Sequence, residues 1–376
     1  MTVPPWFFAG LVALVVTIAL TPPLRRFARR IGAIDVPGGR RINTRPMPRL
    51  GGVAIYVGFV TALLVAMVLT RPVELVRTAE ALSIQITLSP RTEYQALLGI
   101  LLGATVLFLA GMWDDIRGMN PAVKFLVQVA AAAILIPFGL TTRFLTHPLT
   151  GAIVPLGPFG DLFTVIWVVA VVNATNFIDG VDGLASGIAA IAATTLFLTA
   201  GVKADVISMV LAACLVGSAL GFLRHNFSPA RIIMGDSGSM FVGYILGGIS
   251  VMGLYKSFAA LSLIVPILAL AVPIVDTAYA IVRRFRSRQP IYLPDRGHLH
   301  HRLLDRGLSQ RQTVLWLYLV SAFFGVGALV VAGVNRNASL ITLGIIAALL
   351  FVGARRMRLL ERKPVARMPE TPAPRA

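Results

Sequence analysis

Long apolar runs constrain this chain more than any other feature of its sequence. A helix needs roughly 20 mostly apolar residues to cross about 30 Å of hydrocarbon. Hydrophobic residues make up 57% of the 376 residues and charged residues only 13%, against about 25% charged in soluble domains. The sequence therefore excludes a soluble globular enzyme and predicts an all-α, polytopic integral membrane protein with about eleven transmembrane helices. The runs begin near Trp6, Gly52, Ala96, Phe125, Leu162, Leu184, Val206, Met240, Phe258, Val314 and Leu340.

The basic residues indicate how these spans are oriented. Lys and Arg summed over alternate loops give 27 on one side and 7 on the other. Cytoplasmic loops carry the excess of Lys and Arg, so we expect the N-terminus outside and the C-terminus in the cytoplasm. The net charge of +18 then reflects topology and attraction to anionic lipid, and no nucleic-acid partner is expected. The basic side comprises residues 24–50, 113–124, 224–238, 283–313 and 355–376.

The runs and the tail define the domain organisation. Residues 1–354 contain all eleven runs and are expected to form a single membrane-embedded domain. Residues 355–376 are rich in Arg and Pro, which predicts a basic, flexible cytoplasmic tail. Cys214 is the single cysteine, and this excludes a disulfide framework and a cysteine metal cluster.

Polar segments framed by glycine occur on the expected cytoplasmic side. The acids of the outer loops, in contrast, are neither paired nor framed by glycine. This asymmetry predicts an active site that is formed by cytoplasmic loops at the membrane surface. The segments are residues 38–52, 111–121, 173–187, 234–240 and 295–302.

The adjacent carboxylates Asp114 and Asp115 allow two interpretations. They can belong to a solvated helix end with local ion pairing, because Arg117 and Lys124 are close in sequence. Alternatively, two neighbouring carboxylates that both ionise near the bilayer call for a cation. The residues alone leave both interpretations open.

Asn176, Asp179 and Asp182 are spaced three residues apart, which is the spacing of one helical face. Two carboxylates and an amide at this spacing suit an oxygen-ligand site for Mg²⁺, although a turn-rich loop can produce the same pattern. Asp236, in MGDSGSM, is either a helix N-cap or part of a glycine-framed phosphate site at a helix N-terminus.

His298, His300, His301 and Arg302 lie in the loop with the most arginines. A zinc site is the first interpretation of a histidine-rich stretch, but cysteine is absent here and the flanking arginines would repel a cation. Hydrogen-bond donors and arginine forks suit phosphate oxygens better, so this segment predicts an anion clamp. Arg45, with Arg40 and Arg41, either acts in the same way or only marks the cytoplasmic side.

Asp276 differs from the other acids because it lies inside the apolar stretch VPIVDTAYAIV. Carboxylates within membrane segments usually face a bundle interior or a cavity. A structural role, paired with a neighbouring helix, is the interpretation kept for this residue.

Carboxylates suited to Mg²⁺ beside groups suited to phosphate are the components of phosphoryl transfer. The five segments, in this order and between helices, resemble those of the polyprenyl-phosphate N-acetylhexosamine-1-phosphate transferases. The resemblance covers roughly residues 5–310, and NFIDGVDGLA with GDSGS is its most specific part. The HLHHR segment resembles the branch that uses UDP-N-acetylglucosamine. Asn43 is a departure, because relatives often carry histidine at that position.

The resemblance implies a reaction and a cofactor. A C55-type (undecaprenyl) polyprenyl phosphate attacks the β-phosphorus of UDP-N-acetylglucosamine, releasing UMP and leaving a sugar-diphospho-lipid that begins a cell-envelope polysaccharide. Mg²⁺ is the implied metal, with Mn²⁺ as a substitute. Asp236 resembles the principal metal ligand, and Asn176 and Asp179 resemble contacts to the metal-diphosphate and the nucleotide, with Asp182 behind them.

The resemblance also implies roles for the remaining segments. Asp114 and Asp115 resemble the pair that positions or deprotonates the lipid phosphate. The histidine segment resembles the group that holds the diphosphate of the sugar nucleotide in this family, which here comprises His298, His300, His301 and Arg302. A homodimer in the cytoplasmic membrane is the expected assembly.

Two alternatives remain. UDP-N-acetylgalactosamine or UDP-N-acetylmuramoyl-pentapeptide could be the donor, because the same metal and phosphate groups would serve. A secondary transporter is compatible with Asp276 and the many spans. Transporters, however, place polar sites near the midplane and often contain repeats, and neither feature is found in this sequence.

Overall fold

The structure is a computed structural model of the whole chain. It describes residues 4–35, 46–69, 90–146, 152–255, 263–286 and 297–333, together with a few helical residues between 338 and 348. Arg45, Arg40, Arg41 and Asn43, the tail at 355–376 and most of the run from Leu340 lie outside the described residues.

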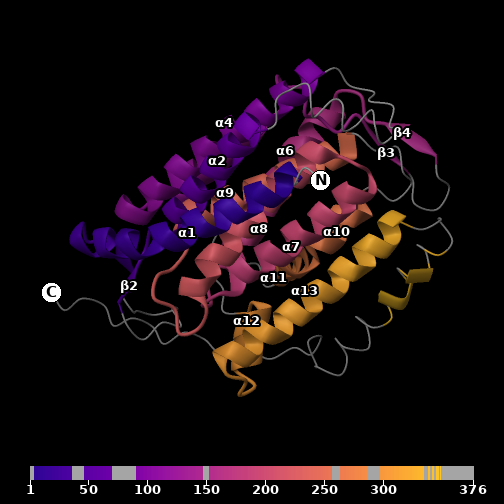
Figure 1. Cartoon of the computed structure of the whole chain (residues 1–376). Helices are drawn as coiled ribbons and strands as arrows, with labels where there is room; N and C mark the ends of the chain where they lie inside the picture. Colours follow the sequence, from indigo (N-terminus) through magenta and orange to yellow (C-terminus); the bar gives the residue numbers. More distant parts are fainter. Residues whose placement is uncertain are drawn as a thin grey trace.

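Helices dominate the described part of the chain (Figure 1). Two short antiparallel hairpins accompany them: β1 (Ile34–Asp35) pairs with β2 (Met47–Pro48), and β3 (Phe144–Thr146) pairs with β4 (Ile153–Pro155). The helices are α1 (Pro5–Arg30), α2 (Gly51–Leu69), α4 (Pro90–Arg117), α5 (Pro121–Ala133), α6 (Phe159–Ile178), α7 (Leu184–Val202), α8 (Val206–Asn226), α9 (Gly235–Tyr255), α10 (Ile264–Ala269), α11 (Ala271–Arg286), α12 (Leu299–Leu304) and α13 (Gln310–Gly333).

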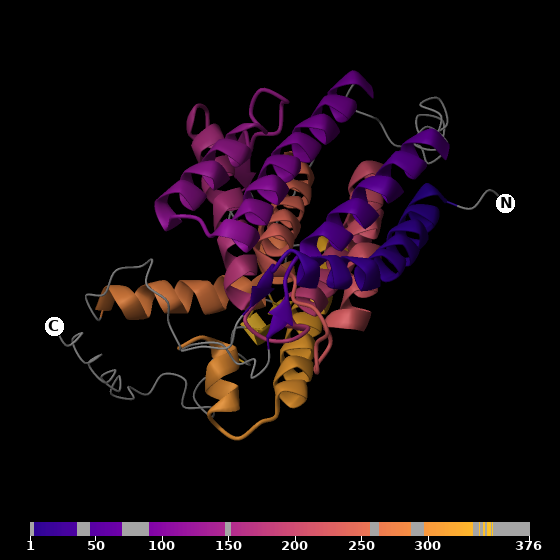
Figure 2. The same cartoon turned by 90° about the vertical axis from the view of Figure 1, so that its left-hand side faces the viewer.

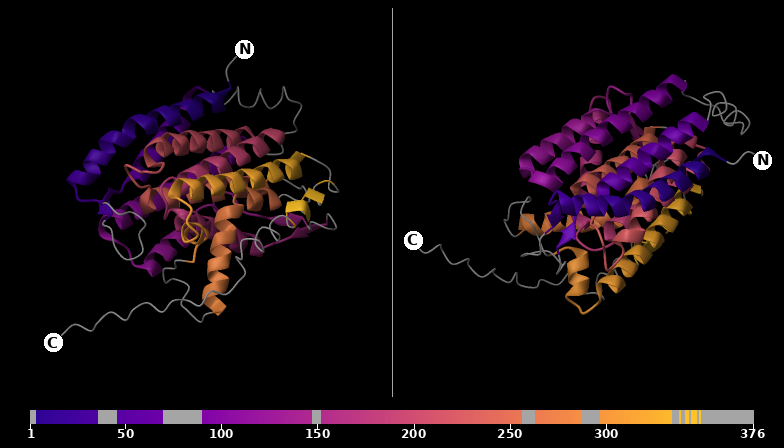
Figure 3. Two further views of the ribbon diagram at one scale, coloured as in Figure 1. Left: turned by 90° about the horizontal axis from the view of Figure 1, so that it is seen from below. Right: turned by 60° about the vertical axis from the view of Figure 1, so that its left-hand side comes forward.

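Eight of the described helices are long and apolar enough to cross a membrane: α1, α2, α4, α6, α7, α8, α9 and α13. They form one bundle, and two further views show its long helices from below and from one side (Figure 3). The prediction of an all-α, multi-pass membrane protein is confirmed.

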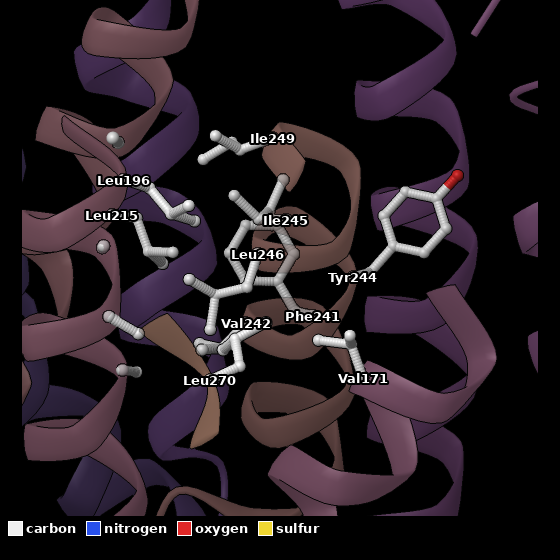
Figure 4. Close-up of a cluster of buried hydrophobic side chains, with 14 of the residues drawn as sticks. Val171, Leu196, Leu215, Phe241, Val242, Tyr244, Ile245, Leu246, Ile249 and Leu270 are labelled. Atoms are coloured by element: carbon white, nitrogen blue, oxygen red, sulfur yellow. The ribbon is translucent and has the colours of Figure 1, made fainter. Parts of the chain in front are cut away.

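Helix α9 lies at the centre of this bundle. It contacts α2, α4, α6, α7 and α8, and nearly all of its residues are buried. Phe241, Tyr244 and Ile245 have no exposed surface, and Figure 4 shows them among side chains from the neighbouring helices. A helix that is apolar on all sides belongs in a core, so the five helices packed around α9 leave it little freedom to move.

Two of the predicted spans have a different form in the structure. The run from Phe125 contains only the 13-residue helix α5, which ends at Ala133 before Pro137 and Gly139. The described part of the run from Phe258 is divided at Leu270 into α10 and α11. Pro273 explains this break, because its missing N–H cannot bond four residues back. The count of eleven therefore stays a prediction.

Helix α11 runs across the direction of the long helices (Figure 2). Its exposed side chains include Val275, Val282 and Phe285, whereas Asp276, Thr277 and Ala280 are buried against the bundle. The apolar stretch around Asp276 therefore belongs to an amphipathic helix, whose buried face carries the polar residues Asp276 and Thr277.

Candidate active site

The described parts of the glycine-framed segments meet at one end of the bundle, which we call the polar end. The C-terminal ends of α4, α6 and α8 are hydrogen-bonded there to the N-terminal ends of α7 and α9 or to the segment before α9. A cavity of about 190 Å³ opens among them. The polar or charged side chains that line it are Asp35, Arg49, Asp115, Asn176, Asp179, Asp182, Asn226, Asp236 and His301.

Asp236 lies in the first turn of α9 and its side chain lines the cavity. Its Oδ1 accepts hydrogen bonds from Asn176 Nδ2 and from Lys124 Nζ, the latter at 2.9 Å. Asn176 also donates to Ser239 Oγ at 2.8 Å. These contacts leave Asp236 engaged with the cavity, so the interpretation of Asp236 as the N-cap of its own helix does not describe the structure.

Asp115 caps α9 instead. Its carboxylate accepts hydrogen bonds from Asp236 N at 2.9 Å, Ser237 N at 3.0 Å and Ser237 Oγ at 2.6 Å. The first amides of a helix have no partner within the helix. Here Asp115, at the end of α4 and 121 residues before Asp236, provides the acceptor. Asp115 therefore sets the position of Asp236 through the backbone.

Asp114 points to a different partner from its neighbour. Its Oδ2 accepts a hydrogen bond from Lys124 Nζ at 2.9 Å, and the same ammonium group contacts Asp236 at 2.9 Å. Lys124, on α5, thus lies between two carboxylates from α4 and α9. The local ion pairing expected for this acidic pair is confirmed for Asp114 and Lys124, while a cation beside the pair stays a prediction.

Close backbone contacts bring α2 and α4 against the start of α9. A Cβ atom at Gly52 would lie 2.1 Å from Gly238 N, and one at Gly111 would lie 2.5 Å from Asp236 O. Distances under 3 Å cannot be accommodated without movement, so only glycine lets the three helices meet at Asp236. Gly52 N donates to Met234 O at 2.9 Å and ties α2 to the segment before α9.

Asn176, Asp179 and Asp182 all line the cavity, but not as one helical face. Helix α6 ends at Ile178, and Gly183, with φ +80°, turns the chain into α7. Asp179 follows the last helical residue, and Asp182 lies in the turn, where it accepts a hydrogen bond from Ala230 N at 2.9 Å. The three residues do meet at one cavity, but the turn after α6, rather than a helical face, brings Asp182 there.

The carboxylates of the cavity are buried and close enough to repel one another. Burial, followed by the nearby charges of Asp236 and Asp115, raises the pKa of Asp179 well above its ordinary value. Burial also raises the pKa of Asp182, although the hydrogen bond from the Ala230 amide acts in the opposite direction. A divalent cation among these oxygens would relieve the repulsion.

The oxygen atoms at the cavity suit a hard cation that takes some of its coordinating oxygens from a bound substrate. Oxygen atoms of Asp236, Asp179 and Asn176 are of the type that Mg²⁺ binds, and Mg²⁺ is usually held by one or two carboxylates plus substrate phosphates. Within the described ranges no three His, Cys, Asp or Glu side chains are arranged to hold a metal ion by themselves, so a cation here would also need oxygen atoms from Asn176, water or a substrate.

The histidine segment faces in several directions. Only His301 lines the cavity. His298 Nδ1 donates to Asp276 Oδ2 at 3.0 Å, and His300 is 2% exposed. Burial lowers the pKa of His300 to about 3, with the His301 charge adding to this shift, so His300 is neutral at pH 7 and cannot attract an anion by charge.

Helix α11 holds this segment through one of its faces. Asp276 accepts hydrogen bonds from His298 and from Leu299 N, the latter at 2.7 Å. The Arg302 guanidinium lies 4.8 Å from the centre of the Tyr279 ring and donates to its hydroxyl at 3.1 Å. Arg283 donates to Gly297 O at 2.8 Å. The structural role expected for Asp276 is thus pairing with the histidine segment rather than with another membrane helix.

Three residues of the cavity are not among those singled out from the sequence: Asp35, Arg49 and Asn226. Asn226 accepts from Gly183 N at 3.0 Å and donates to Ile232 O at 3.0 Å, joining both turns of the cavity wall. Arg49 is followed by Leu50 and the glycine pair Gly51 and Gly52. This position near two glycines was the only sequence feature that could have marked Arg49 as a site residue. Arg45 lies outside the described residues.

Comparison with known proteins gives consistent results. The model of glycosyl transferase family 4 matches residues 97–254, which include Asp114 and Asp236. A probable undecaprenyl-phosphate N-acetylglucosaminyl 1-phosphate transferase of Bacillus subtilis is 36% identical over 322 residues, or 86% of this chain and 84% of that protein.

Two other relatives have related names. A decaprenyl-phosphate N-acetylglucosaminephosphotransferase of Mycobacterium tuberculosis is 36% identical over 368 residues, covering 86% of each chain. An undecaprenyl-phosphate alpha-N-acetylglucosaminyl 1-phosphate transferase of Escherichia coli is 22% identical over 303 residues, covering 79% of this chain and 76% of that protein.

Proposed function

The chain belongs to glycosyl transferase family 4, and on that premise we propose that it transfers N-acetylglucosamine 1-phosphate from UDP-N-acetylglucosamine to a polyprenyl phosphate. The names of the relatives support the transferred group and the lipid acceptor. UDP as the carrier is the part of the proposal that these names leave open. The product is a lipid-linked sugar diphosphate, and UMP is released.

One observation supports this chemistry above the others: Asp236, Asp179 and Asn176 from two separate segments line a single buried cavity at the polar end. A diphosphate donor needs its charge neutralised before a second phosphate can approach it. The cavity has the oxygen ligands for a metal and lies at the end of the bundle where a lipid phosphate would be.

Asp236, Asp179 and Asn176 would hold Mg²⁺, with Mn²⁺ as a substitute. When bound, the metal would supply positive charge to the diphosphate oxygens. Asp115 keeps the start of α9, and thus Asp236, in place. Lys124 keeps a positive charge beside Asp114 and Asp236, where it can attract the incoming lipid phosphate.

The lipid phosphate is its own nucleophile in this scheme. A phosphomonoester has its second pKa near 6, so most of it is dianionic at pH 7. Its oxygen bonds to the β-phosphorus, the bond between that phosphorus and the bridging oxygen breaks, and UMP departs with the electron pair. Asp115 accepts three hydrogen bonds and is poorly placed to form a covalent intermediate.

We place the polar end on the cytoplasmic side of the cytoplasmic membrane. The excess of Lys and Arg in the loops at that end supports this orientation, and nucleotide sugars are then available to the cavity. A homodimer remains a prediction from the family resemblance.

Release of UMP by the purified protein tests the proposal. With UDP-N-acetylglucosamine, undecaprenyl phosphate and Mg²⁺ present, we expect UMP and the lipid-linked sugar, and omission of the lipid or the metal should stop both. Release from UDP-N-acetylgalactosamine or UDP-N-acetylmuramoyl-pentapeptide alone would overturn the choice of donor. No release from any UDP-sugar by a well-folded sample would favour the transporter interpretation.

Replacing Asp276 tests whether α11 supports the reaction. Asp276→Ala removes both hydrogen bonds to the histidine segment, and bonds to a charged group contribute about 1.5–3 kcal/mol each. We expect kcat/KM for the donor to fall by about 10- to 100-fold, with hydrogen exchange increased in residues 297–304.

Asp276→Asn is the matched variant, because its side-chain oxygen can still accept the Leu299 amide. It should lose less activity than Asp276→Ala. Equal, wild-type activity in both variants would show that the histidine segment does not depend on α11.

A further inference from the structure

Backbone hydrogen bonds fix the position of Arg49 beside the cavity. Arg49 N donates to Ala33 O at 2.9 Å, behind the hairpin of β1 and β2. On either side of Arg49, Ile233 N donates to Pro48 O at 3.0 Å and Gly51 N donates to Ile233 O at 3.1 Å. The residue is therefore attached to the same segment that leads into Asp236.

The Arg49 side chain is only partly satisfied by its neighbours. Its Nη2 donates to Asp35 Oδ1, and its Nε is buried without a hydrogen-bond partner. Asp35 is 7% exposed and Arg49 23% exposed at the side chain. Arg49 lines the cavity, and a guanidinium has more N–H groups than the single Asp35 contact uses, so it can donate hydrogen bonds to a ligand in the cavity.

The charges of the cavity point to the kind of ligand. Five carboxylates are among the described residues that line it, and Arg49 is the one guanidinium among them. A guanidinium presents planar N–H groups that match phosphate oxygens, with bonds stronger than those between neutral groups.

Two phosphate sources reach this site, the nucleotide sugar and the lipid. Lys124 lies on α5 next to Phe125 and Leu126, whose side chains are 53% and 64% exposed and so face the lipid. Arg49 instead adjoins the segment 230–233, to which its neighbours Pro48 and Gly51 are hydrogen-bonded and which Asp182 and Asn226 also contact. The lipid phosphate therefore meets Lys124 first, and Arg49 is left for the donor.

We propose that the Arg49 guanidinium, held in place by Asp35, binds a phosphate oxygen of the nucleotide-sugar donor. This inference rests on the proposed function. It adds a binding residue from the first polar segment to a site whose other residues come from α4, α6, α9 and the histidine segment.

The test compares Arg49→Gln with Arg49→Lys, which keeps the charge but loses the fork. Arg26→Gln is the control, because Arg26 is an exposed arginine on α1 away from the cavity. We expect Arg49→Gln to raise KM for UDP-N-acetylglucosamine about 10- to 100-fold while KM for undecaprenyl phosphate changes less than about twofold. Arg49→Lys should recover part of the loss, and Arg26→Gln should match the wild type.

Binding measured without turnover separates this inference from the proposed function. UDP should raise the Tm of the wild type more than uridine does, and Arg49→Gln should remove that difference while leaving the uridine effect unchanged. An increase in KM for the lipid alone would assign Arg49 to the acceptor and overturn the inference. A lower Tm with an unchanged UDP-to-uridine difference would also overturn it, because Arg49 would then only stabilise the β1–β2 hairpin. Wild-type protein that binds UDP but releases no UMP would contradict the proposed function and not the role of Arg49.

Discussion

Asp236→Asn is expected to lower turnover at least about 10³-fold at any Mg²⁺ concentration, because metal charge at a phosphoryl centre is worth several kcal/mol. Asparagine keeps the shape of the side chain, but it removes the negative charge beside Lys124 and weakens a metal ligand. UMP release at saturating donor and lipid measures the effect.

The control for this variant is Asp161→Asn. Asp161 lies at the opposite end of α6 from Asn176 and accepts a hydrogen bond from Thr141 at 2.6 Å, which asparagine can also accept. It should keep wild-type activity. If Asp236→Asn retains more than about a tenth of wild-type turnover, Asp236 is not the principal metal ligand and the assignment of the metal site is wrong.

Gly52→Ala is expected to reduce kcat about 10²-fold, because a displacement of about 1 Å in an active site can have that effect. The new methyl group would lie 2.1 Å from Gly238 N and 2.5 Å from Ser237 Oγ. Either α2 or the start of α9 must move, and Asp236 moves with α9. The same UMP assay, with Tm measured in parallel, reports activity and folding separately.

Gly253→Ala is the matched control within the same bundle. Gly253 lies near the other end of α9, and a Cβ atom there would meet nothing within 4 Å. Gly253→Ala should therefore behave like the wild type. Equal activity in the two variants would show that the close packing of α2 on α9 does not position the site.

Much of the site could be predicted from the sequence because its residues occur in short, local segments. Asn176, Asp179 and Asp182 lie within seven residues, and Asp236 lies between two glycines. Acids are rare in this chain, so each acid near a glycine was informative. The spans could be predicted for a similar reason, since a membrane helix must satisfy its own backbone and be apolar along its whole length.

Other parts could not be predicted because they depend on contacts across long sequence separations. The pairing of Asp276 with His298 joins a helix face to a loop, and both residues alone were compatible with several partners. Arg49 resembled any other basic residue of a cytoplasmic loop until the structure placed it in the cavity. The length of α5 and the break before α11 depend on single prolines and glycines, whose effects on long apolar runs are difficult to predict.

The sequence by itself determined that the chain is a helical membrane protein and pointed to four of the five described acids that line the cavity, because hydropathy and local spacing are properties of the linear chain. Only the tertiary structure decided which contacts each of these residues makes. Asp115 caps α9 while Asp114 pairs with Lys124, and His301 faces the cavity while His298 and His300 are buried. The physical reason is that neighbouring side chains point in different directions, and packing against other helices decides which of them reaches the cavity.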